Sequence, residues 1–141
     1  MSSVVALRPI RVLVVDDETS ILTFAERVLT DAGYEVVAAS DGPNALRLIE
    51  AQRPFDLFVV DILMPRMRGD ELGRQLRRRD PDVKVLYFTG HSDELFEERN
   101  VLWQNEAFIE KPVTVTGLLE AASLLLFGHT NGDPRRTPPG G

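Results

Sequence analysis

Aspartates directly follow two apolar stretches of this 141-residue chain, and they are the residues best placed to do chemistry. Asp16 and Asp17 come after residues 10–15, and Asp61 comes after residues 57–60. Both stretches are rich in β-branched and other apolar residues, as in strands that are buried on both faces of a parallel sheet. Ligands of open α/β sheets bind at the carboxyl ends of the strands, so the three acids are predicted to be functional.

Two more polar residues follow apolar stretches in the same way. Thr89 comes after residues 83–88, and Lys111 comes after residues 107–110. A hydroxyl and an ammonium at these positions suit the oxygens of a phosphoryl group that arrives at Asp61. A carboxylate oxygen can attack phosphorus, so the expected product is an aspartyl phosphate.

A cation must accompany the acids if they lie close together. Each pair of like charges costs on the order of 4 kcal/mol at ~4 Å with an effective dielectric constant near 20. The chain has no cysteine, and oxygen ligands without sulfur or imidazole favour a hard ion that keeps several waters. The sequence therefore predicts Mg²⁺.

The elements that must position these residues alternate between strand and helix. The expected strands are residues 10–15, 34–39, 57–61, 83–88 and 107–110. The expected helices are residues 18–32, 42–52, 69–79, 92–99 and 114–127, of which 92–99 is short and mobile because its apolar positions keep no clean period. With right-handed crossovers, this alternation predicts a flavodoxin-like, doubly wound five-stranded parallel sheet of order 2-1-3-4-5 with five helices. That order brings all five polar residues to one edge.

Length and composition predict one domain, residues 10–127, between an extension of residues 1–9 and a flexible tail of residues 128–141. The net charge of −6 argues against nucleic-acid binding. There is neither a cationic start followed by a long apolar core nor an apolar run of roughly 18 residues, so a cytoplasmic protein without a membrane segment is expected.

Four segments resemble the signatures of the receiver domain of two-component response regulators, in order and at compatible spacing across about residues 10–127. They are LVVDDE, VVDILMPRMRG, LYFTGHS and AFIEKP. The resemblance implies that Asp61 is the phosphoacceptor. It also implies that Asp17, Asp61 and the carbonyl of Leu63 bind Mg²⁺ directly, whereas Asp16 acts mostly through water.

The same resemblance implies roles for the later segments. Thr89 and Lys111 would contact the phosphoryl group, and Thr89 and Phe108 would form a conformational switch. The bond between Lys111 and Pro112 is predicted to be cis, so that the lysine turns back over the site. The segments GHSDE and FIEKP are also similar in sequence to receivers attached to hybrid sensor kinases.

The function predicted from these residues is a phosphoryl-accepting signalling module rather than an enzyme, with self-catalysed phosphorylation and dephosphorylation only. The phosphodonor would be a histidine kinase or a phosphotransfer protein. The output signal would be transmitted by the face built from the fourth helix, the fifth strand and the fifth helix. This face would bind a partner or a second copy. Residues 124–127 are four adjacent apolar residues that cannot all face inward, and this surplus suggests a contact surface.

Two other functions remain open at this point. One is a Mg²⁺-dependent phosphohydrolase of the haloacid dehalogenase kind, with its nucleophile in the Asp16-Asp17-Glu18-Thr19 segment; turnover of a generic phosphomonoester would favour it. The other is a receiver-like scaffold that binds partners without phosphorylation.

Overall fold

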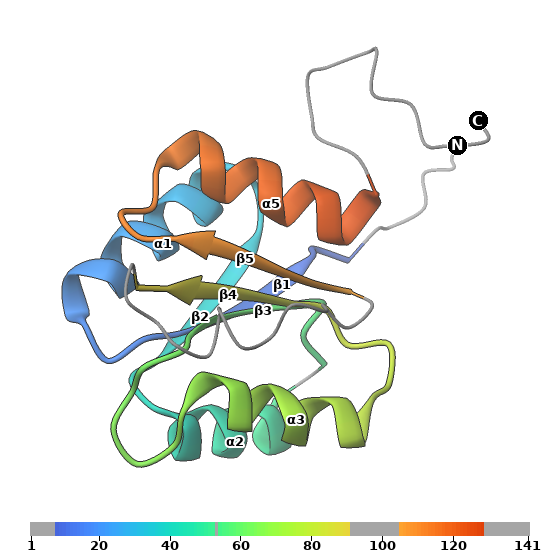
Figure 1. Cartoon of the computed structure of the whole chain (residues 1–141). Helices are drawn as coiled ribbons and strands as arrows, with labels where there is room; N and C mark the ends of the chain where they lie inside the picture. The colour runs from blue at the N-terminus through green and yellow to red at the C-terminus, as the bar shows by residue number, and fades with distance from the viewer. Residues whose placement is uncertain (1–7, 53, 91–104, 129–141) are drawn as a thin grey trace, which may run out of the picture.

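A computed structural model describes residues 8–52, 54–90 and 105–128 of the chain. Five parallel strands form one sheet of order β2-β1-β3-β4-β5, which confirms the predicted topology (Figure 1). The strands are β1 (Arg11–Val15), β2 (Glu35–Ala39), β3 (Leu57–Asp61), β4 (Val85–Thr89) and β5 (Glu106–Glu110). β4 begins two residues later than predicted, because the backbone N–H of Val83 donates to the Asp80 carbonyl in a turn.

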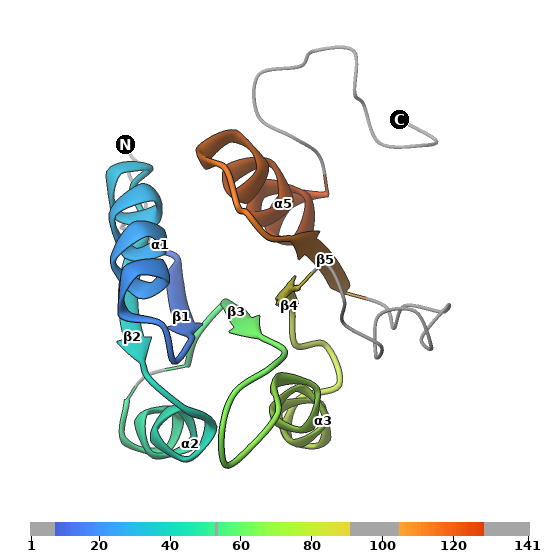
Figure 2. The same ribbon diagram turned by 60° about the vertical axis from the view of Figure 1, so that its left-hand side comes forward.

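The described residues form four helices: α1 (Thr19–Asp31), α2 (Gly42–Ala51), α3 (Gly69–Arg79) and α5 (Val115–Phe127). In the turned view, α1 and α5 lie on one side of the sheet, and α2 and α3 lie on the other (Figure 2). The predicted count of five helices is therefore corrected to four within the described residues. The predicted helix of residues 92–99 lies outside them.

Local residues explain where α2 and α5 begin and where α5 ends. The Asp41 carboxylate accepts a hydrogen bond from the Asn44 N–H at 2.8 Å, which caps the start of α2. The Thr114 hydroxyl caps α5 by accepting the Gly117 N–H at 2.9 Å. Gly128 ends α5 with φ of 82°, a left-handed conformation that glycine adopts without steric cost.

The core has two apolar layers, one on each face of the sheet. All residues of β1, β3 and β4 are buried, as the continuous apolar stretches predicted. Leu13, Val60 and Tyr87 belong to one layer, and Val14 and Val59 belong to the other. The three central strands are thus packed on both faces, and this packing also holds the residues at their ends in place.

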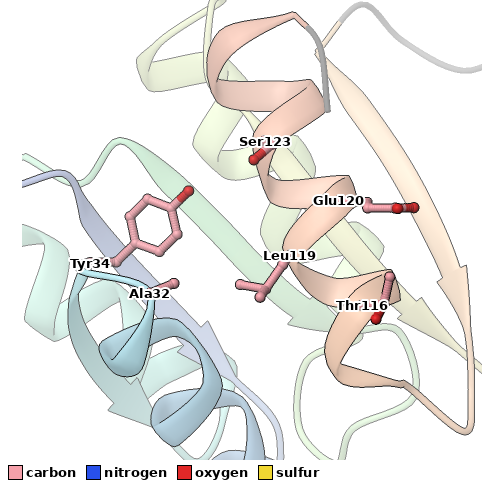
Figure 3. Close-up of a pocket in the computed structure, with 6 residues that line it drawn as sticks. All are labelled: Ala32, Tyr34, Thr116, Leu119, Glu120 and Ser123. Carbon is pink, nitrogen blue, oxygen red and sulfur yellow. The ribbon is translucent and has the colours of Figure 1, made fainter. Parts of the chain in front are cut away.

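A hollow of about 250 Å³ lies in the helical layer between the end of α1 and the side of α5 that faces it (Figure 3). Its lining residues are Ala32, Tyr34, Thr116, Leu119, Glu120 and Ser123. None of the predicted site residues lines this hollow, so the predicted site lies elsewhere. None of the helices in residues 8–52, 54–90 and 105–128 is long and apolar enough to cross a membrane.

Candidate functional site

Three carboxylates meet at the carboxyl ends of β1 and β3. One carboxylate oxygen each from Asp16, Asp17 and Asp61 lies within 4.8 Å of the other two. The cause is the direct pairing of β1 with β3, in which Val15 is opposite Val60, so the residues that follow are neighbours. Asp16 and Asp61 are buried, whereas Asp17 is exposed. The predicted convergence of the three acids is confirmed.

Lys111 reaches into this acidic cluster from the end of β5. Its Nζ lies 3.2 Å from Asp61 Oδ1, 3.3 Å from Glu18 Oε1 and 3.6 Å from Asp16 Oδ2. Its backbone N–H donates to the Thr89 carbonyl at 2.8 Å, which ties β5 to β4. The following peptide bond, Lys111–Pro112, is cis, as predicted.

Glu18 is a member of the cluster that sequence reasoning did not place there. It contacts Lys111 through its side chain, and its backbone N–H donates to Asp16 Oδ1 at 2.9 Å. The available signal was its position as the third acid in the run after β1.

Burial is the main cause that raises the pKa of Asp61, to about 6, and the negative charge of Asp16 adds to it. Lys111 opposes this shift without cancelling it. Burial likewise raises the pKa of Asp16. Burial would lower the pKa of Lys111, but the charges of Asp16 and Asp61 outweigh it and the pKa is raised. The cluster thus carries more negative charge than its one lysine can balance.

One oxygen of the cluster marks where a cation fits. Asp16 Oδ2 is buried and accepts no hydrogen bond within the described residues. A buried polar atom without a partner costs on the order of 1–3 kcal/mol, and more when it is charged. A metal ion or one of its water ligands would satisfy this oxygen. Three carboxylates, one of them open to solvent, fit a hard cation such as Mg²⁺.

The loop between β3 and α3 folds back over the end of β3. The N–H of Gly69 donates to the Ile62 carbonyl at 2.8 Å, and a Cβ at Gly69 would lie 2.1 Å from the backbone oxygen of Asp61. Only a residue without a side chain fits at this distance. Leu63 lies in the same loop, two residues after Asp61, and is 51% exposed.

Thr89 and Phe108 lie on the two strands beyond Asp61. Asp61 is in register with Phe88, so the buried Thr89 is one residue further along β4. Phe108 is half-buried on β5 and its ring stacks on that of Tyr87, with centroids 5.1 Å apart. All predicted site residues thus lie within the described part of the chain, at or near one edge of the sheet.

Comparison with known proteins gives one consistent family. The sequence model of the response regulator receiver domain matches residues 12–123. PhoP, the alkaline phosphatase synthesis transcriptional regulatory protein of Bacillus subtilis (strain 168), is 35% identical over 102 residues, or 72% of this chain and 42% of PhoP. A response regulator receiver protein from Sinorhizobium medicae WSM419 has a crystal structure with a TM-score of 0.76 and 32% identity, covering 86% of this chain and 97% of that one.

Response regulator TrrA from Thermotoga maritima, crystallised in complex with Mg²⁺-BeF, has a TM-score of 0.72 and 29% identity, covering 83% of this chain and 99% of that one. The chain spans about half the length of the curated relatives it matches. The matched residues include the acids of β1 and β3 as well as Thr89 and Lys111. The chain therefore belongs to the response regulator receiver domains of two-component systems.

Proposed function

We propose that Asp61 accepts a phosphoryl group from a histidine kinase or a phosphotransfer protein. The observation that carries this assignment is the position of Asp61: it is buried at the end of a central strand, with two further acids beside it and the Lys111 ammonium 3.2 Å from its Oδ1. Family membership disfavours the haloacid-dehalogenase-like phosphohydrolase and the unphosphorylated scaffold. We assign the chain no catalysis beyond its own phosphorylation and dephosphorylation.

The residues of the site have distinct roles in this proposal. Asp17, Asp61 and the Leu63 carbonyl would hold Mg²⁺ directly, and Asp16 would hold it through water, which would give Asp16 Oδ2 a hydrogen-bond donor. When bound, the ion would supply positive charge that offsets the acids and lets another anion approach.

The transfer itself uses an oxygen of Asp61 as the nucleophile. This oxygen forms a bond to phosphorus while the bond between phosphorus and the donor breaks, and the donor leaves with that electron pair. The Lys111 ammonium already faces Asp61 and donates to an oxygen of the arriving group. The Thr89 hydroxyl donates to another, because Thr89 lies one residue beyond the register partner of Asp61.

Acetyl phosphate tests this assignment. With Mg²⁺ present, the intact mass of the protein should rise by one phosphoryl group, about 80 Da for one-site chemistry. Asp61→Ala should show no adduct, whereas Asp82→Ala, which changes an exposed aspartate on the α3–β4 connection, should match the wild type. An adduct on Asp61→Ala would refute the assignment. Sustained hydrolysis of a phosphomonoester without a protein adduct would instead support the phosphohydrolase.

We also propose that output uses the face that includes β5 and α5, together with residues 92–99, which lie outside the described residues. Leu124 and Phe127 on α5 are 46% and 45% exposed, which is unusual for large apolar side chains. This face would bind an output partner or a second copy more tightly after phosphorylation.

Sedimentation with and without beryllofluoride measures self-association through this face. We expect beryllofluoride to increase association of the wild type and Leu124→Asp to abolish the increase. Val115→Asp is a matched control, because Val115 is also exposed on α5 but lies nine residues away, on the opposite side of the helix at ~100° per residue. Equal effects of the two variants would exclude the proposed face.

A further inference from the structure

Tyr87 is the centre of a buried contact chain that joins α3, β4 and β5. Its ring stacks on Phe108 with centroids 5.1 Å apart and an interplanar angle of 22°. Its hydroxyl donates to Glu106 Oε2 at 3.2 Å, and Arg77 of α3 donates to the same oxygen at 2.5 Å. The side chain of Glu106 is fully buried, so hydrogen-bond donors such as these two stabilise its charge.

The backbone of α3 closes the remaining side of Tyr87. A Cβ at Gly73 would lie 1.8 Å from the Tyr87 hydroxyl oxygen, so the hydroxyl occupies the space where any other residue would place its side chain. Tyr87 itself is fully buried. The hydroxyl end of the ring is therefore held both by α3 and by Glu106. Phe108 is half-buried whereas Tyr87 is fully buried, so Phe108 is the less tightly enclosed member of the stacked pair.

The stacked pair is also close to the predicted chemistry. Tyr87 and Thr89 are two residues apart on β4, so their side chains project on the same face of the sheet. Tyr87 and Phe108 are register partners on β4 and β5, and Lys111 follows three residues after Phe108. A change in Thr89 when an anion arrives at Asp61 therefore acts on the same face as the stacked rings.

We propose that Tyr87 is a positioning residue: it is a fixed platform that holds Phe108 in the arrangement of the phosphoryl-free protein. The inference rests on the proposed phosphorylation of Asp61. A phosphoryl group, or beryllofluoride in its place, favours another position of Phe108 and must break the stack. Weakening the stack then removes a cost of ligand binding, so the affinity for beryllofluoride should increase.

A double-mutant cycle on beryllofluoride affinity, measured by calorimetry with Mg²⁺ in excess, tests the platform. An aromatic pair contributes about 0.5–1.5 kcal/mol, which corresponds to a roughly two- to tenfold change in affinity. Tyr87→Leu and Phe108→Leu should each tighten binding by this factor, and the double variant should gain no more than either single one. Tyr34→Phe, which changes the other tyrosine, should bind like the wild type.

The fluorine resonance of a labelled tyrosine adds a measurement that would not change on ligand binding if Tyr87 only stabilised the fold. With 3-fluorotyrosine incorporated, Tyr34→Phe leaves one resonance, that of Tyr87, and we expect beryllofluoride to shift it. Tyr87→Phe keeps the ring while losing the hydroxyl, so it should bind beryllofluoride more nearly like the wild type than Tyr87→Leu does. If Tyr87→Leu does not fold, the half-buried Phe108→Leu and the fluorine signal still decide the question.

The outcomes separate the two proposals. If the wild type does not bind beryllofluoride, both the phosphoacceptor site and the platform role are overturned. If it binds, but the Tyr87 resonance stays fixed and Phe108→Leu leaves the affinity unchanged, only the platform role is overturned. Additive effects of Tyr87→Leu and Phe108→Leu would also overturn it.

Discussion

Asp61→Asn is expected to be more stable than the wild type at pH 7–8 without Mg²⁺, and the difference should vanish below about pH 4. The pKa of Asp61 is about 6 in the folded protein, raised from 3.8 chiefly by burial and then by Asp16. The folded state therefore binds the proton more tightly than the unfolded state does. Wild-type stability must fall as the pH rises from about 4 through 6, because ionising Asp61 then disfavours folding.

The expected gain is on the order of 1–3 kcal/mol, since one pKa unit corresponds to about 1.4 kcal/mol and Asp16 shares the same charge repulsion. Asparagine has nearly the same shape and keeps an oxygen that faces Lys111. Urea unfolding across the pH range measures the effect. A wild type that is more stable than Asp61→Asn at pH 8 without Mg²⁺ would contradict the prediction.

Asp56→Asn is a control for which we expect the opposite effect on stability. Burial would raise the pKa of Asp56, but hydrogen bonds from the Arg8 side chain and the Arg11 backbone N–H, with their positive charges, outweigh burial and lower the pKa. This carboxylate stabilises the fold above its unfolded pKa, and the contribution is lost as the pH falls. Asp56→Asn should therefore destabilise the protein at neutral pH.

Added Mg²⁺ should reverse the order of wild type and Asp61→Asn. A ligand that binds only the folded state stabilises it, and the gain grows with the logarithm of the ratio of ligand concentration to dissociation constant. Protons compete with the ion for Asp61, so the affinity for Mg²⁺ should fall about tenfold per pH unit below pH 6.

The features that could be predicted from the sequence are those with local signals. Continuous apolar stretches predicted the buried strands, and the pairing of β1 with β3 followed from the predicted strand order. The convergence of Asp16, Asp17 and Asp61 could be predicted from that strand order alone, because each acid lies at or just after the end of its strand. The cis bond after Lys111 was likewise expected from the turn that its proline must make.

The features that could not be predicted depend on partners far apart in the chain. Glu106 lies just before the fifth strand predicted from the sequence, yet it is buried in β5 and paired with Arg77, 29 positions away. The contact between Glu18 and Lys111 spans 93 positions. No local pattern indicates such pairs, because each residue alone resembles an ordinary surface charge.

Gly69→Ala is the second change expected to have a large effect. The new Cβ would lie 2.1 Å from the backbone oxygen of Asp61, 2.8 Å from its carbonyl carbon and 2.9 Å from a methyl carbon of Val60. Two of these atoms are backbone in a central strand, so they cannot rotate away as a flexible side chain can. We expect a loss of roughly 2–4 kcal/mol in the free energy of unfolding, at or above the usual range for overpacking.

The same variant should accept phosphoryl groups at least about tenfold more slowly, because the strain falls on the backbone of the nucleophile and small misplacements there are costly. Gly90→Ala is the matched control: Gly90 directly follows Thr89, but a Cβ there meets nothing within 4 Å. Its stability should stay within about 0.5 kcal/mol of the wild type. Urea unfolding and the rate of the intact-mass increase with acetyl phosphate measure both effects. If Gly69→Ala matched Gly90→Ala in both, the loop would not hold Asp61 in place, and the position of the nucleophile would depend on β3 alone.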